Sequence, residues 1–399
     1  MKATGIVCEY NPFHFGHKYQ IEKTREKFPE DAIVCVMSGN FVQRGEPAIL
    51  NKWERAKTAV ENGADAVVEL PVPFCIENSS IFSDGAISIL ESLGVSHISF
   101  GSESGNPEKI KKLSNFIYEN SDVIERCIKD KVQEGLSYPR ARAEIINSLT
   151  GFEYDSILKN SNDILALEYV ARMKNAEPVL IKRINSEYND KGLNGTFSSA
   201  TAIREALYAG IDVANCIPEK EIAAIDTFLG GRKSDDGGNP YLERVFNILR
   251  YKVLSSSAEE LNQIFGAEEG LGSLLKKNIR SCNSYDDAVN VLKSKRYTQT
   301  RIKRVILNTV LDITGDQVKA AKPYIRILAV SDRGAEYIKQ VKKERTDLAF
   351  IDNFGRNNIK NSENSSILEL NIKATDIYNQ ITGLDLYEYS EYVKKALKL

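Results

Sequence analysis

The sequence predicts an α/β protein, in which a doubly wound parallel sheet is followed by a mainly helical region. Two observations predict this fold. Over the first hundred residues, short apolar runs alternate with helical patterns, as is typical of parallel strands joined by right-handed crossovers. Beyond a Gly- and Asp-rich stretch at 234–240, the pattern becomes mostly helical. We therefore expect a first domain over residues 1–230 and a helical second domain over residues 240–399.

The composition is that of an ordinary soluble protein. The net charge is −2, so a nucleic-acid surface, if there is one, must be a local patch. The six cysteines form no CxxC pair, which favours reduced thiols over a zinc site. No apolar run approaches the ~18 residues of a membrane span, and the N-terminus does not have the pattern of an export signal. We expect a cytoplasmic protein without a membrane segment.

The first predicted unit is a strand at 4–8, a loop at 9–17 and a helix at 18–27. The loop reads EYNPFHFGH and holds two of the three histidines, His14 and His17. Imidazoles on either side of Gly16 at a helix N-terminus suit a phosphate, because backbone NH groups and the helix dipole attract anions. The match predicts nucleotidyl transfer, in which charge on the α-phosphate is stabilised by positioned donors. The alternative is two ordinary histidines at a helix start.

Further strands and helices follow in alternation. The predicted strands lie at 31–38, 66–70, 97–101 and 178–184, and the predicted helices at 52–62, 83–93, 106–149 and 163–175.

A second phosphate motif begins at Ser198. It places the hydroxyls of Ser199 and Thr201 at a helix start, with Arg204 one turn later. NH groups, hydroxyls and a guanidinium can then converge on one anion. The alternative is an ordinary helix cap with a surface arginine.

Two further positions at predicted strand ends have possible roles in binding a nucleotide. Gly101 ends the fourth strand, where a glycine lets an adenine lie against the backbone. Arg183 lies at the fifth strand, where it could reach phosphate or ribose. The alternatives are a strand-terminating turn and a surface pair with Lys182.

The helical part contains a basic run. Its helices are expected at 241–254, 257–265, 271–278, 285–293 and 300–311, and residues 324–330 form either a late strand or a buried segment. No acid interrupts the run, and Tyr297 lies within it, which suits an RNA backbone. The alternative is a solvated helix face. The predicted RNA-binding residues are Lys295, Arg296, Arg301, Lys303 and Arg304.

The acidic residues show no spacing that demands a metal cage. A Mg²⁺ ion bound mainly through triphosphate oxygens would need little from the protein. We therefore predict no protein metal site.

Several segments together resemble one family. Residues 5–17, 36–48, 52–53, 69–71, 100–103, 198–204 and 296–304 are similar to those of the bacterial tRNA(Met) cytidine acetate ligases, a branch of the HxGH nucleotidyltransferase superfamily. The resemblance implies that ATP and acetate form acetyl-adenylate with release of pyrophosphate. The acetyl group then passes to N4 of the wobble cytidine of elongator tRNA(Met), giving N4-acetylcytidine and AMP.

The resemblance also implies a set of site residues. His14 and His17 would contact the phosphates as catalytic residues, with Ser199, Thr201 and Arg204 near the pyrophosphate. The ATP site would be formed by Val7, Cys8, Glu9, Tyr10, Asn11, Pro12, Phe13, His14, Phe15, Gly16, His17, Lys18, Tyr19, Gln20, Gly101, Asn162 and Arg183.

The chain departs from the family pattern at two positions. Cys8 stands where the family often has alanine or valine, which adds a buried thiol. Asn189 stands where the family often has histidine, and an asparagine cannot transfer protons.

Two other functions stay open from the sequence. The first is an adenylyltransferase that makes a dinucleotide-type cofactor, for which the basic run would be surplus. The second is a non-catalytic RNA-binding protein that keeps ATP only as a ligand.

Overall fold

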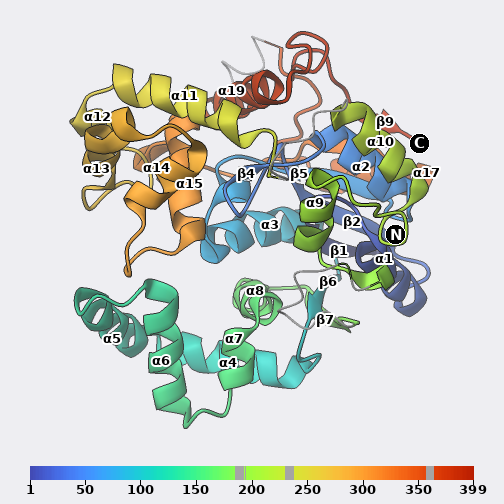
Figure 1. Cartoon of the computed structure of the whole chain (residues 1–399). Helices are drawn as coiled ribbons and strands as arrows, with labels where there is room; N and C mark the ends of the chain where they lie inside the picture. The colour runs from blue at the N-terminus through green and yellow to red at the C-terminus, as the bar shows by residue number, and fades with distance from the viewer. Residues whose placement is uncertain (185–192, 194, 230–237, 356–363) are drawn as a thin grey trace.

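The computed structural model describes residues 1–184, 193, 195–229, 238–355 and 364–399. A seven-stranded sheet lies at its centre, and helices surround it (Figure 1). The strands are β1 (Ala3–Cys8), β2 (Ala32–Ser38), β3 (Phe41–Val42), β4 (Glu46–Pro47), β5 (Ala66–Leu70), β6 (His97–Ser102), β7 (Glu177–Lys182), β8 (Ile327–Val330) and β9 (Leu397–Lys398). The α-helices are α1 (Phe15–Lys27), α2 (Lys52–Glu61), α3 (Ser79–Leu93), α4 (Pro107–Glu119), α5 (Ser121–Gln133), α6 (Tyr138–Thr150), α7 (Asp155–Lys159), α8 (Ser161–Val170), α9 (Ala200–Tyr208), α10 (Glu219–Leu229), α11 (Leu242–Ser255), α12 (Ala258–Asn262), α13 (Leu271–Asn278), α14 (Tyr285–Leu292), α15 (Gln299–Leu311), α16 (Gly315–Ala320), α17 (Asp332–Glu344) and α19 (Ser365–Thr382).

The strand order is β7-β6-β1-β2-β5-β8-β9, and the predicted parallel sheet is confirmed. The five predicted strands pair in parallel, from β7 across to β5. Of the two alternatives for residues 324–330, the structure has a strand over part of the range, β8, and it runs antiparallel to β5. An antiparallel edge on an otherwise parallel sheet is common in doubly wound folds. The short hairpin of β3 and β4, in the loop after β2, was not predicted.

Helices cover both faces of the sheet because its strands are apolar on both sides. Along β2, Val34 belongs to the hydrophobic cluster that contains Leu90 of α3. The next residue back, Ile33, belongs to a second cluster with Ile21 of α1 and Trp53 of α2. Successive side chains of a strand point to opposite faces, so each face has its own core. This is the doubly wound arrangement that the alternating pattern predicted.

Several helix boundaries differ from the prediction, and the region predicted as helical over 106–149 forms the three helices α4, α5 and α6. Helix α1 begins at Phe15 instead of residue 18, because the side chain of His14 caps it. Helix α3 begins at Ser79 instead of residue 83, because Asn78 accepts hydrogen bonds from the two NH groups that follow Ser79. Side-chain caps of this kind satisfy NH groups that have no partner within the helix. Helix α8 ends at Val170, five residues before the predicted end.

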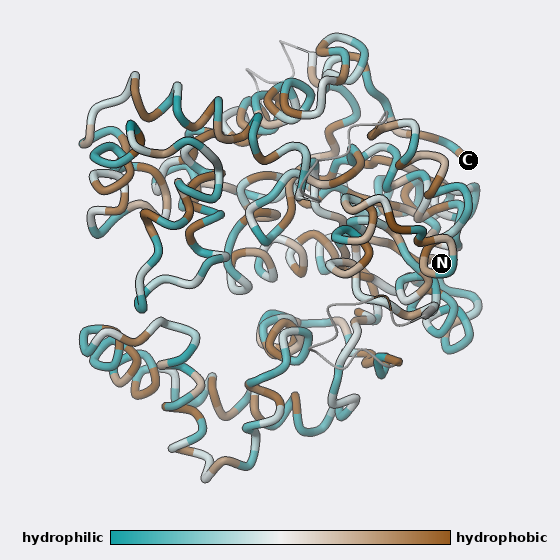
Figure 2. Tube along the Cα trace, in the orientation of Figure 1, coloured by the Kyte–Doolittle hydropathy of each residue, from teal (hydrophilic) through white to brown (hydrophobic). Residues whose placement is uncertain are grey.

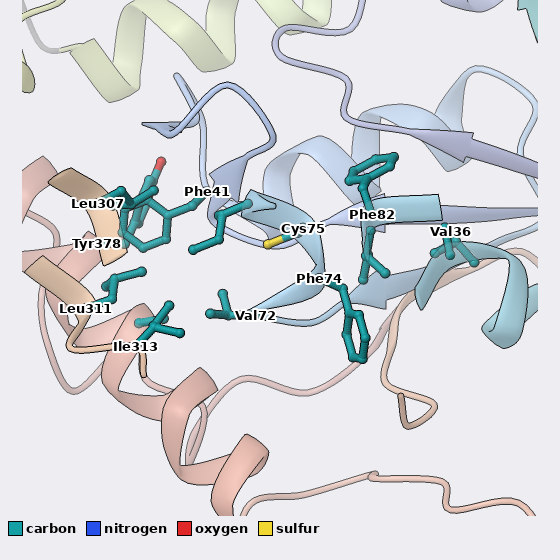
Figure 3. Packing of buried hydrophobic residues seen from close by; sticks show 14 of the residues in the cluster. Val36, Phe41, Val72, Phe74, Cys75, Phe82, Leu307, Leu311, Ile313 and Tyr378 are labelled. Carbon is teal, nitrogen blue, oxygen red and sulfur yellow. The ribbon is translucent and has the colours of Figure 1, made fainter. Parts of the chain in front are cut away.

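The helical region shares a core with the sheet. Leu307 of α15 and Tyr378 of α19 lie beside Phe41 of β3, and Ile313 lies towards Val72, which follows β5 (Figure 3). Strands β8 and β9 also come from this part of the chain. The division into domains at 1–230 and 240–399 stays a prediction, and residues 234–237 of the expected linker lie outside the described residues.

A buried group of charges joins the end of the chain to the sheet. Lys52 Nζ lies 2.7 Å from Glu69 Oε1 and also contacts Glu391, and all three side chains are at most 2% exposed. Arg326 Nη2 lies 3.7 Å from Glu391 Oε2. Removing one partner of such a group leaves an uncompensated buried charge, so the four residues hold the C-terminal segment against β5.

The outer helices are amphipathic. Hydrophobic and hydrophilic residues alternate along α5 and α6 (Figure 2), and each helix buries a few apolar side chains, Ile124 and Ile128 in α5. None of the described helices combines the length and apolar character needed to cross a membrane. The six cysteines are free thiols, as predicted.

Candidate active site

A cavity of about 580 Å³ opens at the carboxyl ends of the strands. The chain runs from β1 to β2 and β5 on one side, and returns to β6 and β7 on the other. The strand order therefore reverses between β1 and β6, which is where open α/β sheets bind ligands. The loop after β1, the end of β6 and the starts of α8 and α9 form the wall of the cavity.

The two histidines of the first motif are held by the backbone. His14 Nδ1 accepts a hydrogen bond from Gly16 N at 3.0 Å, and His17 Nδ1 accepts one from His14 N at 3.3 Å. The two rings stack with centroids 3.6 Å apart. A side chain on Gly16 would lie 2.8 Å from the His14 ring, so this position requires a glycine. The spacing of the motif thus builds a reciprocal cap at the start of α1.

Both histidines are neutral. Burial, followed by the charges of Arg183 and Arg204, lowers the pKa of His14 to about 3. Burial and the neighbouring His14 hold the pKa of His17 well below its usual value. Because Nδ1 of each ring accepts an NH, the single proton of the neutral ring is on Nε2. The cavity therefore has two imidazole NH donors that can bind an anionic oxygen without carrying charge themselves.

The second motif meets the first at this cavity. Ser199 caps α9 by accepting from Ala202 N at 3.2 Å. Arg204 Nη1 donates to the carbonyl oxygen of Asn11 at 2.6 Å, across 193 residues of sequence. Two helix N-termini and a guanidinium therefore converge beside the two histidines. This combination is suited to binding a polyphosphate.

Comparison with known proteins agrees with this geometry. Residues 1–391 match the family model described as HIGH nucleotidyl transferase. The chain belongs to the HIGH nucleotidyl transferase family.

Curated relatives share a narrower name within this family. The chain is 37% identical over 405 residues to the tRNA(Met) cytidine acetate ligase of Caldicellulosiruptor saccharolyticus, covering 100% of this chain and 98% of the relative. It is 36% identical over 353 residues to the protein of the same name from Oceanobacillus iheyensis, covering 86% of this chain and 87% of that one.

Two solved structures of one protein superpose over the whole chain. The apo structure of TmcAL from Thermotoga maritima has a TM-score of 0.89 at 30% identity, with 100% of both chains covered. A second structure of that protein, bound with alpha-thio ATP, has a TM-score of 0.86 at 29% identity and the same coverage.

A further set of predicted residues lies at the ends of β6 and β7 in this family member. Asn162 Nδ2 donates to Glu103 Oε1 at 2.6 Å. A side chain at Gly101 would lie 3.4 Å from Arg183 Cγ, so the glycine and the arginine are neighbours. Arg183 Nε is buried and has no hydrogen-bond partner within the described ranges. This part of the cavity has donors left for a bound ligand.

The structure brings most of the predicted site residues together, although their roles stay predictions. Pro12, Phe13, Phe15 and Lys18 do not line the cavity, and Phe13 is buried against Tyr10 with ring centroids 4.9 Å apart. Gly16 and Tyr19 line a small recess next to the cavity. The predicted residues that do line the main cavity are Val7, Cys8, Glu9, Tyr10, Asn11, His14, His17, Gln20, Gly101, Asn162, Arg183, Ser199, Thr201 and Arg204. Asn189, where the family often has histidine, lies outside the described residues.

Several lining residues were not predicted. Gln43 and Arg44 follow β3, and their polar character in a loop after a strand was a usable signal. Phe82 of α3 and Tyr169 of α8 also line the cavity. An apolar residue on a helix gives no sign in the sequence that it faces a site rather than the core.

The predicted RNA-binding residues divide into two groups. Lys295 and Arg296 are exposed, although Arg296 lies 3.5 Å from Glu269 Oε2. The other three are partly buried along α15. Arg301 lies 3.8 Å from Glu269, and Lys303 lies 2.5 Å from Glu46. Arg304 interacts electrostatically with the buried Glu77. Their role in RNA binding stays a prediction.

Proposed function

We propose that this protein is an ATP-dependent ligase that forms acetyl-adenylate from ATP and acetate and transfers the acetyl group to N4 of the wobble cytidine of elongator tRNA(Met). The observation that carries this proposal is the single cavity that joins both phosphate motifs at the reversal of strand order. Membership of the HIGH nucleotidyl transferase family and the shared name of the curated relatives support the same reaction.

ATP would be held along the side of the cavity where α1 and α9 begin. The triphosphate would lie at the N-termini of α1 and α9, where His14, His17 and Arg204 provide donors. Gly101 and Arg183 would lie beside the adenosine. The described residues hold no group of three or more His, Cys, Asp or Glu side chains that could bind a metal. A Mg²⁺ ion would therefore be bound mainly by the triphosphate oxygens.

The residues fit both steps of the reaction. An acetate oxygen attacks the α-phosphorus, and pyrophosphate leaves with the electron pair of the broken P–O bond. The two Nε2–H groups and Arg204 donate to the oxygens that gain charge, which is electrostatic catalysis by preorganised donors. Adenylation makes the acetyl carbon reactive enough for the weakly nucleophilic amine of cytidine. Attack by that amine gives N4-acetylcytidine and releases AMP.

The tRNA would approach over the basic residues of the helical region. Lys295 and Arg296 are exposed for contact with phosphates. The loop after β3 joins this region to the cavity, because Arg44 lines the cavity and Gly45 packs on the backbone of Arg304. An RNA whose phosphates are bound by Lys295 and Arg296 could thus place one of its bases in the cavity. We place this reaction in the cytoplasm.

The test is incubation of the protein with ATP, labelled acetate and tRNA(Met), followed by nuclease digestion of the tRNA. We expect label in N4-acetylcytidine, release of AMP and pyrophosphate, and no label in a transcript with uridine at the wobble position. The double variant His14→Ala/His17→Ala should abolish turnover, because both imidazole donors to the phosphates are gone. Turnover without RNA dependence would favour a cofactor adenylyltransferase, and tRNA binding without turnover a non-catalytic protein.

A further inference from the structure

One part of the cavity is not used by the triphosphate and adenosine placement proposed above, although the family resemblance includes its Glu9 among the ATP-site residues. It consists of Glu9, Val42 and the aromatic side chains Phe82, Phe100 and Tyr169, which we name the acceptor recess. Val42 and the three aromatic residues are 2–5% exposed, and the rings of Phe100 and Tyr169 have centroids 5.5 Å apart. The recess is therefore a firm, mostly apolar wall with a single carboxylate.

Glu9 is fixed through one oxygen and open at the other. Its Oε1 accepts from Gln43 N at 2.7 Å and from Ser38 Oγ at 3.3 Å. Arg55, which is fully buried, donates to the Glu9 carbonyl oxygen at 2.5 Å and so anchors the backbone. Among the residues that the structure describes, no donor reaches Oε2. The carboxylate thus presents a free acceptor in the wall of the cavity.

This free acceptor is unfavourable for the first step alone. ATP and acetate are both anions, and a carboxylate in a partly buried wall repels them. A group that donates hydrogen bonds, by contrast, gains from Oε2. The exocyclic amine of cytosine is such a donor, and carboxylates are its usual partners in nucleic-acid recognition. Aromatic side chains are the usual surface for an unstacked RNA base.

We propose that the acceptor recess binds the cytosine base of the tRNA, and that Glu9 accepts the proton that its N4 amine loses. The proposal rests on the proposed function and names the acceptor site within it. Uracil presents the O4 acceptor where cytosine has its amine, so the same carboxylate would repel it. Glu9 would thereby contribute to both the rate of transfer and the choice of base.

The transfer step balances with Glu9 as the base. The N4 lone pair forms a bond to the carbonyl carbon of acetyl-adenylate. The bond from that carbon to the phosphate oxygen breaks, and AMP leaves with the electron pair. The surplus N4 proton passes to Glu9 Oε2 and from there to water. Cytidine and acetyl-adenylate thus give N4-acetylcytidine, AMP and one proton.

The experiment separates the two steps in the Glu9→Gln variant. Adenylation is measured by acetate-dependent exchange of labelled pyrophosphate into ATP, and transfer by single turnover of enzyme-bound labelled acetyl-adenylate with tRNA. We expect transfer to fall about 100-fold, the usual effect of losing a general base, and to fall at least ten times more than exchange. Glu9→Asp keeps a carboxylate and should recover part of the transfer rate. Glu22→Gln, an exposed carboxylate change on α1, is the control for lost charge.

Base selection gives a second readout that does not depend on turnover. A tRNA with uridine at the wobble position is used as a competitor of labelled tRNA(Met). In Glu9→Gln, the preference for cytidine over uridine should fall about 10-fold, because the amide can donate to O4.

Two results would overturn the assignment. In the first, exchange falls as much as transfer in Glu9→Gln, which would mean that Glu9 serves ATP or its Mg²⁺. In the second, transfer and base preference both stay as in the wild type. Failure of the proposed function is distinguishable, because the wild-type protein itself would then transfer no acetyl group.

Discussion

Measuring whether His14 is neutral in the folded protein is the most direct test of the geometry described for the candidate active site. We consider His14→Asn, because an asparagine can still cap α1 while it cannot titrate. In the wild type, burial and two arginines lower the pKa of His14 to about 3, against 6.5 for an ordinary histidine. Between pH 6.5 and pH 3, therefore, His14 is protonated in the unfolded chain and neutral in the folded chain. The stability due to neutral His14 is present above pH 6.5 and is lost as the pH falls.

The size of this effect follows from the two pKa values. At pH 5 the unfolded histidine is almost fully protonated and the folded one is almost fully neutral. The difference corresponds to about 2 kcal/mol lost between pH 8 and pH 5, at 1.36 kcal/mol per pKa unit. In His14→Asn this loss should be absent. The loss of the charge repulsion that His14 exerts on His17 acts in the same direction.

The assay is urea denaturation of both proteins at pH 8 and pH 5. We expect the free energy of unfolding to drop between the two pH values by about 2 kcal/mol more in the wild type than in His14→Asn. Titrating groups other than His14 and His17 are common to both proteins and cancel in this comparison. An equal pH dependence in the two proteins would refute the neutral, buried imidazole, and with it the Nε2–H donors of the proposed chemistry.

Three further predictions concern the surroundings of the site. Glu221, buried in α10, accepts from Phe13 N at 3.1 Å, and burial raises its pKa to about 7. A raised pKa stabilises the folded state fully below pH 4.5, and this stabilisation is lost as the pH rises through 7. In urea denaturation, the wild type should therefore lose roughly 2–3 kcal/mol more of its free energy of unfolding between pH 5 and pH 8 than Glu221→Gln does. Gly45→Ala should lower the free energy of unfolding by at least about 2 kcal/mol more than Gly94→Ala, because both have φ of +78° but only Gly45 would meet backbone, at 2.6 Å; equal losses would exclude this contact as the cause. Arg296→Ala should reduce the slope of log tRNA affinity against log salt by about one, measured by filter binding, and an unchanged slope would remove Arg296 from the RNA surface.

Much of the sheet was predictable from local pattern. The central strands β2 and β5 are mostly apolar runs that are buried along their whole length, as is typical of a parallel sheet covered on both faces. The edge strand β7 is only partly buried, but its apolar residues at 179–181 still gave a strand pattern. The boundaries were harder to predict, because they depend on side-chain caps. Helix α1 begins inside the first motif because His14 bonds to Gly16 N. The sequence contains this cap, but only as two residues with several possible partners.

The candidate site was predictable where the chemistry is specific. The spacing of His14, Gly16 and His17 was enough to predict their geometry, since these residues lie within four positions of a helix start and form the cap themselves. Phe82 and Tyr169 had no such signal, because an apolar side chain on a helix is equally suited to the core. The basic run was predicted as one exposed surface, but its three residues in α15 are partly buried. Lys303 contacts Glu46 of β4, and Arg304 lies near Glu77, which precedes α3. These contacts depend on elements far away along the chain, which the local sequence does not report.

The sequence alone determined the parallel sheet, the two phosphate motifs and the family that they resemble. These features depend on residues close together along the chain, where the periodicity and spacing of the residues determine the local backbone geometry. The tertiary structure alone decided how distant residues meet. Arg204 reaches Asn11, and Lys52 meets Glu391 across 339 residues. The free oxygen of Glu9 likewise depends on the hairpin that occupies its other oxygen. Such contacts depend on how the whole chain packs, and no local pattern records it.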